Sequence, residues 1–280
     1  MKLRESVMRT VFFLTACLSA LAVALICLYL FGGGIPVMGK IGWGNFFGSI
    51  WKPAKSLYGI WPMILGSLYA TLGATILGGG LGLLTAIFLA RFCPGRLYRI
   101  CKPAVNLMAG IPSVVYGRFG LMVLVPMLRR LTGGAGKGLL TVSLLLGLMI
   151  LPTVTGVAES ALRAVPEAYY EGSLALGASR EWSVFRVQLP AAAPGVLSGV
   201  ILGIGRAIGE TMAVVMVAGN QPAAPNGLLS GLRTLTANIV LEMGYASGMH
   251  RQALIATGVV LFAFILLINL GFTLVKRRNQ

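Results

Sequence analysis

An arginine and a glutamate interrupt one of the most apolar stretches of this sequence. Arg206 and Glu210 lie four residues apart within the segment 195–218, so on a continuous helix their side chains would project from one side and reach each other. A charged side chain at membrane depth costs about 3 kcal/mol on insertion scales, so both groups should face protein or water. Because a guanidinium donates two parallel hydrogen bonds to an oxyanion such as phosphate, the pair could also bind an anion.

Two interpretations of this pair stay open, and they can coexist. In the first, Arg206 and Glu210 form a structural salt bridge and contact no solute. In the second, Arg206 meets an anionic solute as it passes, while Glu210 holds the guanidinium in place or exchanges with the solute. Binding along such a route must be weak, because an ion that is held strongly cannot leave. Arg206 and Glu210 are therefore the candidate substrate-pathway residues.

The composition places these charges in a membrane protein. Hydrophobic residues make up 57% of the chain, charged residues only 11%, and the mean hydropathy is +0.87. A helix needs about 20 apolar residues to cross the hydrocarbon core. Six segments reach that length, at 10–31, 64–90, 105–128, 139–157, 195–218 and 253–275. We therefore predict an all-α, polytopic membrane bundle of six transmembrane helices.

The third of these segments contains helix-breaking residues. Gly110, Pro112, Gly117 and Arg118 interrupt its apolar pattern. Breaks of this kind are tolerated in a membrane where the helix faces protein or a cavity. We expect a broken helix here, and the sequence assigns no role to Arg118.

The basic residues favour one orientation of the bundle. With both termini in the cytoplasm, the inside segments carry Lys2, Arg4, Arg9, Arg91, Arg96, Arg99, Lys102, Arg163, Arg180, Arg186, Lys276, Arg277 and Arg278. The outside segments then carry Lys40, Lys52, Lys55, Arg129, Arg130, Lys137, Arg233 and Arg251. The excess on one side follows the positive-inside rule. The net charge of +16 is thus a signal of topology and of contact with lipid headgroups, and it does not indicate a nucleic-acid partner.

The chain divides into three parts by pattern. Residues 1–31 are expected to form an uncleaved N-terminal transmembrane helix. The external segment 32–62 combines tryptophans with lysines, which is typical of chain lying at the headgroup level, and a docking surface for an external partner is the alternative. Residues 63–280 would form a core of five transmembrane helices that includes the cytoplasmic loop 158–193.

Small residues recur at every fourth position in two of the spans. The second span carries Gly66, Ala70, Ala74, Gly78, Gly82, Ala86 and Ala90, and the fifth carries Gly195, Gly199, Gly203 and Ala207. Helices associate in membranes through close packing, and small residues at this spacing let two backbones approach. Both spans should therefore be buried among other helices.

The sequence pattern of the loop 158–193 predicts short helices. Pro166 can open a helix with Glu167 near its positive end, and Gly177 can close it. Ser179 can cap a second helix that runs to about Gln188, before two prolines return the chain to the membrane. Such a projecting element could sit in a groove of a partner protein.

The same loop resembles the cytoplasmic signature of ABC importer permeases. That signature reads Glu-Ala-Ala, three residues, Gly, nine residues, Ile, one residue, Leu-Pro. The chain matches its spacing with Glu171, Gly177, Leu189 and Pro190, and it departs by having Gly172, Ser173 and Val187 at the other motif positions. The resemblance implies the type I permease fold and a coupling loop that docks into a cleft of a separate ATPase subunit. It assigns the contact, or its geometry, to the four matching residues.

Three further stretches resemble the PstC-type permeases of high-affinity phosphate importers. They are the run Arg-Ala-Ile-Gly-Glu-Thr-Met-Ala-Val at 206–214, Gly-Ile-Pro-Ser-Val-Val-Tyr-Gly at 110–117 and Arg-Thr-Leu-Thr at 233–236. The sister PstA type tends to differ directly after Gly-Glu-Thr. The resemblance implies phosphate translocation across a bacterial inner membrane, with a second homologous permease, an ATPase dimer and a periplasmic phosphate-binding protein as partners. Molybdate, sulfate or phosphonate remains an alternative substrate.

The sequence lacks the residues that a nucleotide-binding loop or a hydrolase site requires. The glycine-rich stretch 133–137 is not a phosphate-binding loop, because Leu131 and Gly138 stand where glycine and Ser or Thr are required. Any ATP would therefore be hydrolysed by another chain, and we expect no catalytic residue, cofactor or metal here. An intramembrane hydrolase is disfavoured, since His250 is the only histidine and we expect it at the surface of an outer boundary. A scaffold or sensor would have no ATPase partner.

Overall fold

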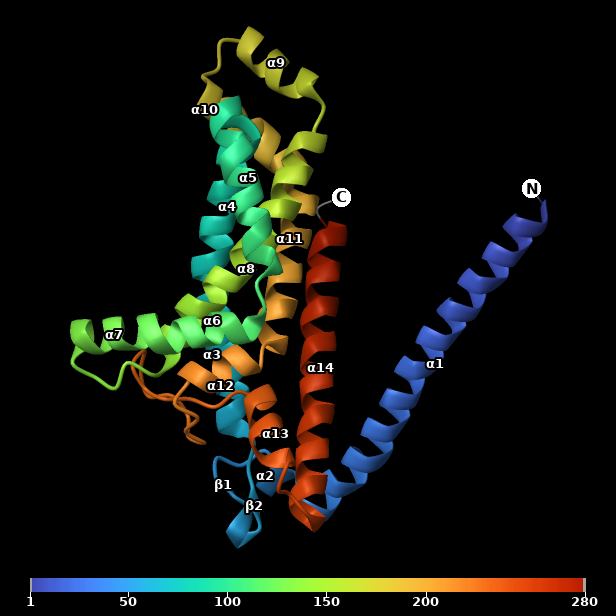
Figure 1. Ribbon diagram of the computed structural model, residues 1–280, viewed down its shortest axis with the longest axis vertical. Helices are drawn as coiled ribbons and strands as arrows, with labels where there is room; N and C mark the ends of the chain where they lie inside the picture. The colour runs from blue at the N-terminus through green and yellow to red at the C-terminus, as the bar shows by residue number, and fades with distance from the viewer. Residues whose placement is uncertain (1, 279–280) are drawn as a thin grey trace.

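The computed structural model describes residues 2–278 as a helical bundle (Figure 1). Its first half comprises α1 (Lys2–Ile41), α2 (Trp43–Phe46), β1 (Trp51–Lys52), a short 3-10 turn η1 (Pro53–Lys55), β2 (Leu57–Tyr58), α3 (Trp61–Ala74), α4 (Gly80–Ile87), α5 (Gly95–Gly110), α6 (Ser113–Phe119) and α7 (Val125–Thr132). The second half comprises α8 (Leu139–Ala164), α9 (Glu167–Ala175), α10 (Arg180–Ser183), α11 (Leu189–Gly209), α12 (Met212–Val217), α13 (Leu235–Met243) and α14 (Gly248–Arg278). Single π-helical turns η2 (Thr75–Gly79), η4 (Gly120–Leu124) and η5 (Val184–Gln188) join neighbouring helices into longer rods, and a further π-helical turn, η3 (Phe88–Phe92), ends the rod that contains α3 and α4.

Five rods are long and apolar enough to cross a membrane, and one bent pair can supply a sixth crossing. The rods are Val7–Ile41, Trp61–Phe92, Leu139–Ala164, Arg180–Gly209 and Gly248–Gly271. The pair consists of Gly95–Gly110 and Ser113–Thr132, which meet at 99°. The break falls at Ile111 and Pro112, as Gly110 and Pro112 predicted. The all-α fold with up to six spans is therefore confirmed.

The first helix is longer than its sequence pattern indicated. The pattern ended it at residue 31, whereas α1 continues to Ile41 with Pro36 inside it. Lys2 and Arg4 at its start, and 276–278 at the other end of the chain, have side chains outside the described residues. The division of the chain at 31 and 62 stays a prediction.

The aromatic residues after α1 divide into two groups. Phe46, Trp51 and Tyr58 are buried against protein, in a core cluster that also contains Leu254 of α14. Trp43 and Trp61 are exposed. Only the exposed rings fit a position among lipid headgroups, and the buried ones fix the β1–β2 hairpin to the bundle.

Helix α8 lies at the centre of the bundle, between the α3–α4 rod and α11. A Cβ added at Gly78 would collide with the carbonyl of Gly147 on α8, and one added at Gly82 would lie 3.0 Å from Val154. On α11, a Cβ at Gly199 would lie 3.1 Å from Val157. The predicted burial of both small-residue series is confirmed, because α8 approaches each of them more closely than larger side chains would permit.

This close approach predicts a difference between two glycines of one rod. Gly78→Ala should lower the free energy of unfolding by about 1 to 3 kcal/mol, the usual cost of overpacking. Gly80→Ala should be neutral or stabilise by up to about 1 kcal/mol, because Gly80 is exposed with nothing within 4 Å of the added carbon. Thermal unfolding of the two purified variants checks this, and equal midpoints would contradict the packing described.

The rod that follows α9 is continuous where the sequence indicated a turn. We expected Pro190 and Pro194 to return the chain to the membrane, but residues 180–209 form one rod with both prolines inside it. A proline lacks the N–H that an α-helix needs at that position. Pro190 lies two residues after the π-helical turn η5 and Pro194 lies inside α11, and prolines are tolerated in membrane helices where neighbouring helices and local π-helical adjustments compensate for the lost bond. The expectation of a turn was wrong for this reason.

The predicted span 195–218 is not one continuous helix. Helix α11 ends at Gly209, Glu210 has extended backbone angles of φ −69° and ψ 129°, and α12 begins at Met212. The span is therefore broken at membrane depth, directly after the candidate arginine.

Different secondary-structure elements lie at the two ends of the molecule. Helix α9 lies at one end, and α1 begins and α14 ends in the same half of the molecule (Figure 1). The β1–β2 hairpin lies at the opposite end. We call these the α9 end and the hairpin end.

Candidate functional site

Arg206 lies in the last turn of α11 and is only partly buried. Its Nη1 donates one long hydrogen bond of 3.5 Å to the Thr153 hydroxyl on α8. Among the side chains that the structure describes, no carboxylate lies within ion-pair distance of Arg206. Most of the donors on this guanidinium therefore remain available to a solute.

Glu210 does not face Arg206 as the sequence suggested. Its Oε1 accepts a hydrogen bond of 3.0 Å from the Ala213 backbone N–H, in the first turn of α12. Its carbonyl oxygen accepts another of 3.1 Å from the Thr236 hydroxyl. The interpretation as a structural salt bridge is wrong for this structure, because the break after Gly209 removes the helical geometry that would align residues four apart. Glu210 instead caps α12 and holds the break open.

The two broken spans meet beside this site. Gly117 on α6 packs so closely against α12 that an added Cβ would lie 2.9 Å from Ala213. Tyr116 is buried, and its hydroxyl donates to the Met108 carbonyl at 2.9 Å, which bridges the bend between α5 and α6. Non-helical backbone at membrane depth occurs where it is covered by protein or lines a cavity. Because two breaks lie side by side here, the region around Ala213 is a candidate for the route of a solute across the membrane.

Arg118 lies on the exposed side of α6. Within the described residues no ion pair or hydrogen bond of its side chain is found. The structure thus brings Arg206, Glu210 and the 110–117 stretch together but leaves Arg118 on the surface of this subunit.

At the α9 end, residues 165–183 form a knob that projects from the bundle (Figure 1). Pro166 precedes α9, and Gly177, with φ of +85°, ends it, as the sequence predicted. Ser179 caps α10 by accepting from the Trp182 N–H at 3.2 Å, and Ser173 and Ser183 bond to each other at 2.9 Å. These contacts close the knob into a compact unit.

The tip of the knob exposes apolar surface. Leu176 is 92% exposed and Trp182 is 54% exposed. They border a groove of about 430 Å³ whose lining residues are Ser173, Leu176, Gly177, Ala178, Ser179 and Trp182. Among the motif residues, Glu171 and Gly177 lie on the exposed part of the knob. Leu189 and Pro190 lie at the start of α11, at the base of the knob.

Residues 80–280 match the family model described as "Binding-protein-dependent transport system inner membrane component". That match spans α4 to α14 and contains the knob and both breaks. The chain belongs to this family. The predicted resemblance to ABC importer permeases is confirmed, and the chain is a multi-pass membrane permease of that kind.

Named relatives are similar to this permease over most of its length. The "Probable ABC transporter permease protein YqgH" of Bacillus subtilis is 39% identical over 228 residues, which are 78% of this chain and 74% of the relative. The "Phosphate transport system permease protein PstC" of Mesorhizobium japonicum is 33% identical over 265 residues, covering 87% and 81% of the two chains. The PstC of Haemophilus influenzae is 32% identical over 279 residues, covering 92% and 88%.

Solved structures share the fold at lower identity. A chain of a bacterial alginate ABC transporter, solved in complex with an alginate pentasaccharide-bound periplasmic protein, aligns with a TM-score of 0.66 at 17% identity and covers 99% of the permease and 98% of itself. A chain of the inward-facing MetNI methionine ABC transporter aligns with a TM-score of 0.61 at 21% identity, covering 82% and 100%. These likenesses confirm the ABC importer permease fold.

The permease contains two networks of charged side chains that its sequence did not indicate. At the hairpin end, Glu242 accepts from Trp51 Nε1 at 2.9 Å and Arg233 Nη1 at 2.5 Å, and it pairs with His250 Nε2 at 2.7 Å. His250 is therefore partly buried, with a side chain that is 15% exposed, and it belongs to this network. One signal was available, since Glu242 is the only carboxylate after Glu210 in the sequence.

The second network lies near the α9 end. Glu159 of α8 is buried and accepts from the Tyr98 hydroxyl at 2.8 Å, Lys102 Nζ at 2.7 Å and Arg163 Nε at 3.0 Å. A buried carboxylate needs such partners, because an uncompensated charge in a low-dielectric interior is costly. This network joins α5 to α8.

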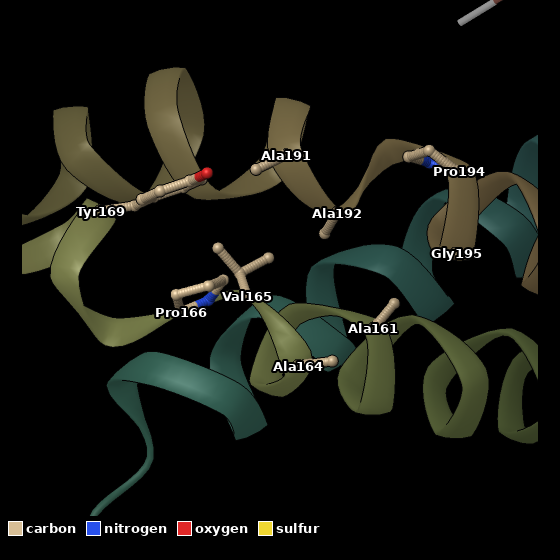
Figure 2. A pocket seen from close by; sticks show the side chains of 9 residues that line it. All are labelled: Ala161, Ala164, Val165, Pro166, Tyr169, Ala191, Ala192, Pro194 and Gly195. Atoms are coloured by element: carbon tan, nitrogen blue, oxygen red, sulfur yellow. The ribbon is translucent and has the colours of Figure 1, made fainter. Parts of the chain in front are cut away.

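A further cleft of about 430 Å³ separates the knob from the bundle (Figure 2). Its walls come from the end of α8 and the start of α11, and the lining residues are Ala161, Ala164, Val165, Pro166, Tyr169, Ala191, Ala192, Pro194 and Gly195. The only polar side-chain atom among them is the Tyr169 hydroxyl. No charged side chain belongs to the lining of this cleft.

Proposed function

We propose that this chain is the permease subunit that moves inorganic phosphate across a bacterial inner membrane in an ATP-driven importer. The observation that carries the proposal is the Arg206 guanidinium beside two broken spans, which has one long hydrogen bond and no ion pair among the residues that the structure describes. A planar guanidinium suits a phosphate oxyanion. Relatives named as phosphate transport permeases, 32 to 33% identical over most of the chain, give the proposal its substrate.

The proposal includes an orientation and partners. We place both termini and the knob in the cytoplasm, where an ATPase dimer docks, and the hairpin end in the periplasm, where a phosphate-binding protein delivers the solute. The position of α9, the start of α1 and the end of α14 in one half of the molecule is consistent with this orientation (Figure 1). A second homologous permease would complete the membrane core, as is usual for transporters that alternate access around a site near the midplane.

The permease needs only to offer the anion weak contacts along the route and to keep that route in shape. Arg206 offers the anion charge-assisted hydrogen bonds along the route, and Glu210 keeps the break in place by capping α12. Binding at one such contact is weak enough for the ion to leave. Selectivity would then rest mainly with the external binding protein, and the free energy would come from ATP hydrolysed by the partner chains.

A competition assay tests the substrate. Cells that depend on this permease should take up labelled phosphate, and unlabelled phosphate should compete while molybdate, sulfate and phosphonate at the same concentration should not. Competition by another oxyanion at equal or lower concentration would assign the permease to that solute instead. Cells without the permease give the background.

A further inference from the structure

Helix α9 is attached to the bundle by side chains on one of its faces. Glu167 and Tyr170 lie three residues apart and thus on the same side of the helix. Arg91 Nη1 donates to both carboxylate oxygens of Glu167, at 2.9 and 2.8 Å. The same guanidinium lies 5.2 Å from the centroid of the Tyr170 ring, within cation–π distance. One arginine therefore contacts two side chains of the first turn of α9.

Arg91 comes from the last turn of a different rod, the π-helical turn η3 at the end of 61–92. Its side chain is only 14% exposed, whereas that of Glu167 is 53% exposed. An ordinary surface ion pair contributes little to stability because water competes for both charges. Here the arginine is mostly withdrawn from water, so water competes less for its contacts with Glu167 and Tyr170 than it would at an ordinary surface pair.

Beyond Arg91, the rod 61–92 is fastened to α8. The Thr155 hydroxyl on α8 donates to the Gly82 carbonyl at 3.0 Å, and Arg163 Nη2 donates to the Leu89 carbonyl at 2.9 Å. Helix α8 also carries Thr153, whose hydroxyl accepts a hydrogen bond from Arg206. A continuous set of contacts thus runs from the knob through Arg91 to the candidate route, without passing along the α10–α11 rod.

We propose that Arg91 is a positioning residue that transmits movement of α9 to the rod 61–92 and α8, so that displacement of the knob opens and closes the route at Arg206. The inference rests on the proposed function, because it needs an ATPase that moves the knob. It differs from transmission along the chain, which joins α9 to α8 through Val165 and Pro166 and continues through α10 and α11, because those covalent connections remain when Arg91 is replaced. Contacts alone do not establish coupling, so the test must measure it directly.

The first experiment uses the complete transporter, with both permeases, the ATPase and the binding protein, in proteoliposomes. ATP hydrolysis and phosphate uptake are measured together. Arg91→Gln should keep ATP hydrolysis within about twofold of the wild type and lower phosphate taken up per ATP by about fivefold or more. The double variant Arg91→Glu with Glu167→Arg should recover at least half of the lost uptake per ATP. Arg96→Gln is the matched control, since Arg96 is an exposed arginine five residues away and should change neither quantity.

The second experiment does not depend on the solute. Spin labels replace Leu84 and Leu202, which are exposed on the rod 61–92 and on α11. A non-hydrolysable ATP analogue should change the distance between the labels in the otherwise wild-type complex, and Arg91→Gln should remove most of that change.

The outcomes separate the inference from the function it rests on. Unchanged uptake per ATP in Arg91→Gln, a reversed pair no better than the single variants, or a full distance change in Arg91→Gln would each overturn the role of Arg91. Loss of complex assembly in Arg91→Gln and in the milder Glu167→Gln would also overturn it, because the pair would then be only structural. Absence of phosphate uptake by the wild-type complex would count against the proposed function, and the distance measurement would still decide the role of Arg91.

Discussion

Replacing Arg206 by glutamine is expected to abolish phosphate uptake and to leave the transporter assembled. Glutamine keeps most of the length and polarity of arginine but has no charge and no planar fork. Two charge-assisted hydrogen bonds at about 1.5 kcal/mol or more each would be lost, which lowers uptake by about 100-fold or more. Assembly should survive, because Arg206 makes no ion pair and only one long hydrogen bond within the described structure. Labelled phosphate uptake and co-purification of the partner subunits measure the two effects.

The controls for this variant come from the same chain. Arg129→Gln removes an exposed arginine of α7 and should transport normally. Thr153→Val removes the one hydrogen-bond partner of Arg206 but keeps its charge, so uptake should fall far less than in Arg206→Gln. Uptake by Arg206→Gln within twofold of the wild type would remove Arg206 from the mechanism.

Changing Leu176 to aspartate is expected to separate the permease from its ATPase. Leu176 is the most exposed large side chain of the knob, at 92%. If the knob docks in a cleft, burial of this leucine contributes about 1.5 to 3 kcal/mol, and an aspartate would add the cost of a buried charge. The affinity of the ATPase for the permease should therefore fall by about 30-fold or more. Binding of purified ATPase to the permease in nanodiscs measures this directly.

A leucine elsewhere provides the comparison. Leu228 is 63% exposed in the loop between α12 and α13, so Leu228→Asp should leave ATPase binding unchanged. The knob should also stay folded in Leu176→Asp, because neither the Ser179 cap nor the Ser173–Ser183 bond involves Leu176. Full ATPase binding by Leu176→Asp would show that the tip of the knob is not the docking surface.

Local signals in the sequence were enough to predict most of the helices. Runs of apolar residues located the spans, Gly110 and Pro112 located the bend, and Pro166 and Gly177 located α9. Each of these signals acts through the backbone of its own neighbourhood, either by removing a donor or by permitting a left-handed conformation. The series of small residues added one long-range inference, that two rods pack closely against other helices.

The features that the sequence did not reveal depend on contacts between distant residues. Arg91 and Glu167 are 76 positions apart, and Trp51 and Glu242 are 191 apart, so no spacing rule could pair them. The break at Glu210 is a different case. The rule that residues four apart meet assumes an unbroken helix, and the Ala213 N–H at the start of α12 competes for the Glu210 carboxylate. Likewise, the rule that a proline ends a helix fails in α11, where Pro194 lies inside the helix, because packing against neighbouring helices can compensate for the lost hydrogen bond in a membrane protein.

The most direct test of this account is ATP-dependent phosphate entry into proteoliposomes that contain this permease, its sister permease, the ATPase and the binding protein. With ATP supplied on the side that carries the knob, labelled phosphate should accumulate from the opposite side, and vesicles with Arg206→Gln should not accumulate it. Accumulation without ATP, or accumulation that persists when this permease is left out, would contradict the central claim.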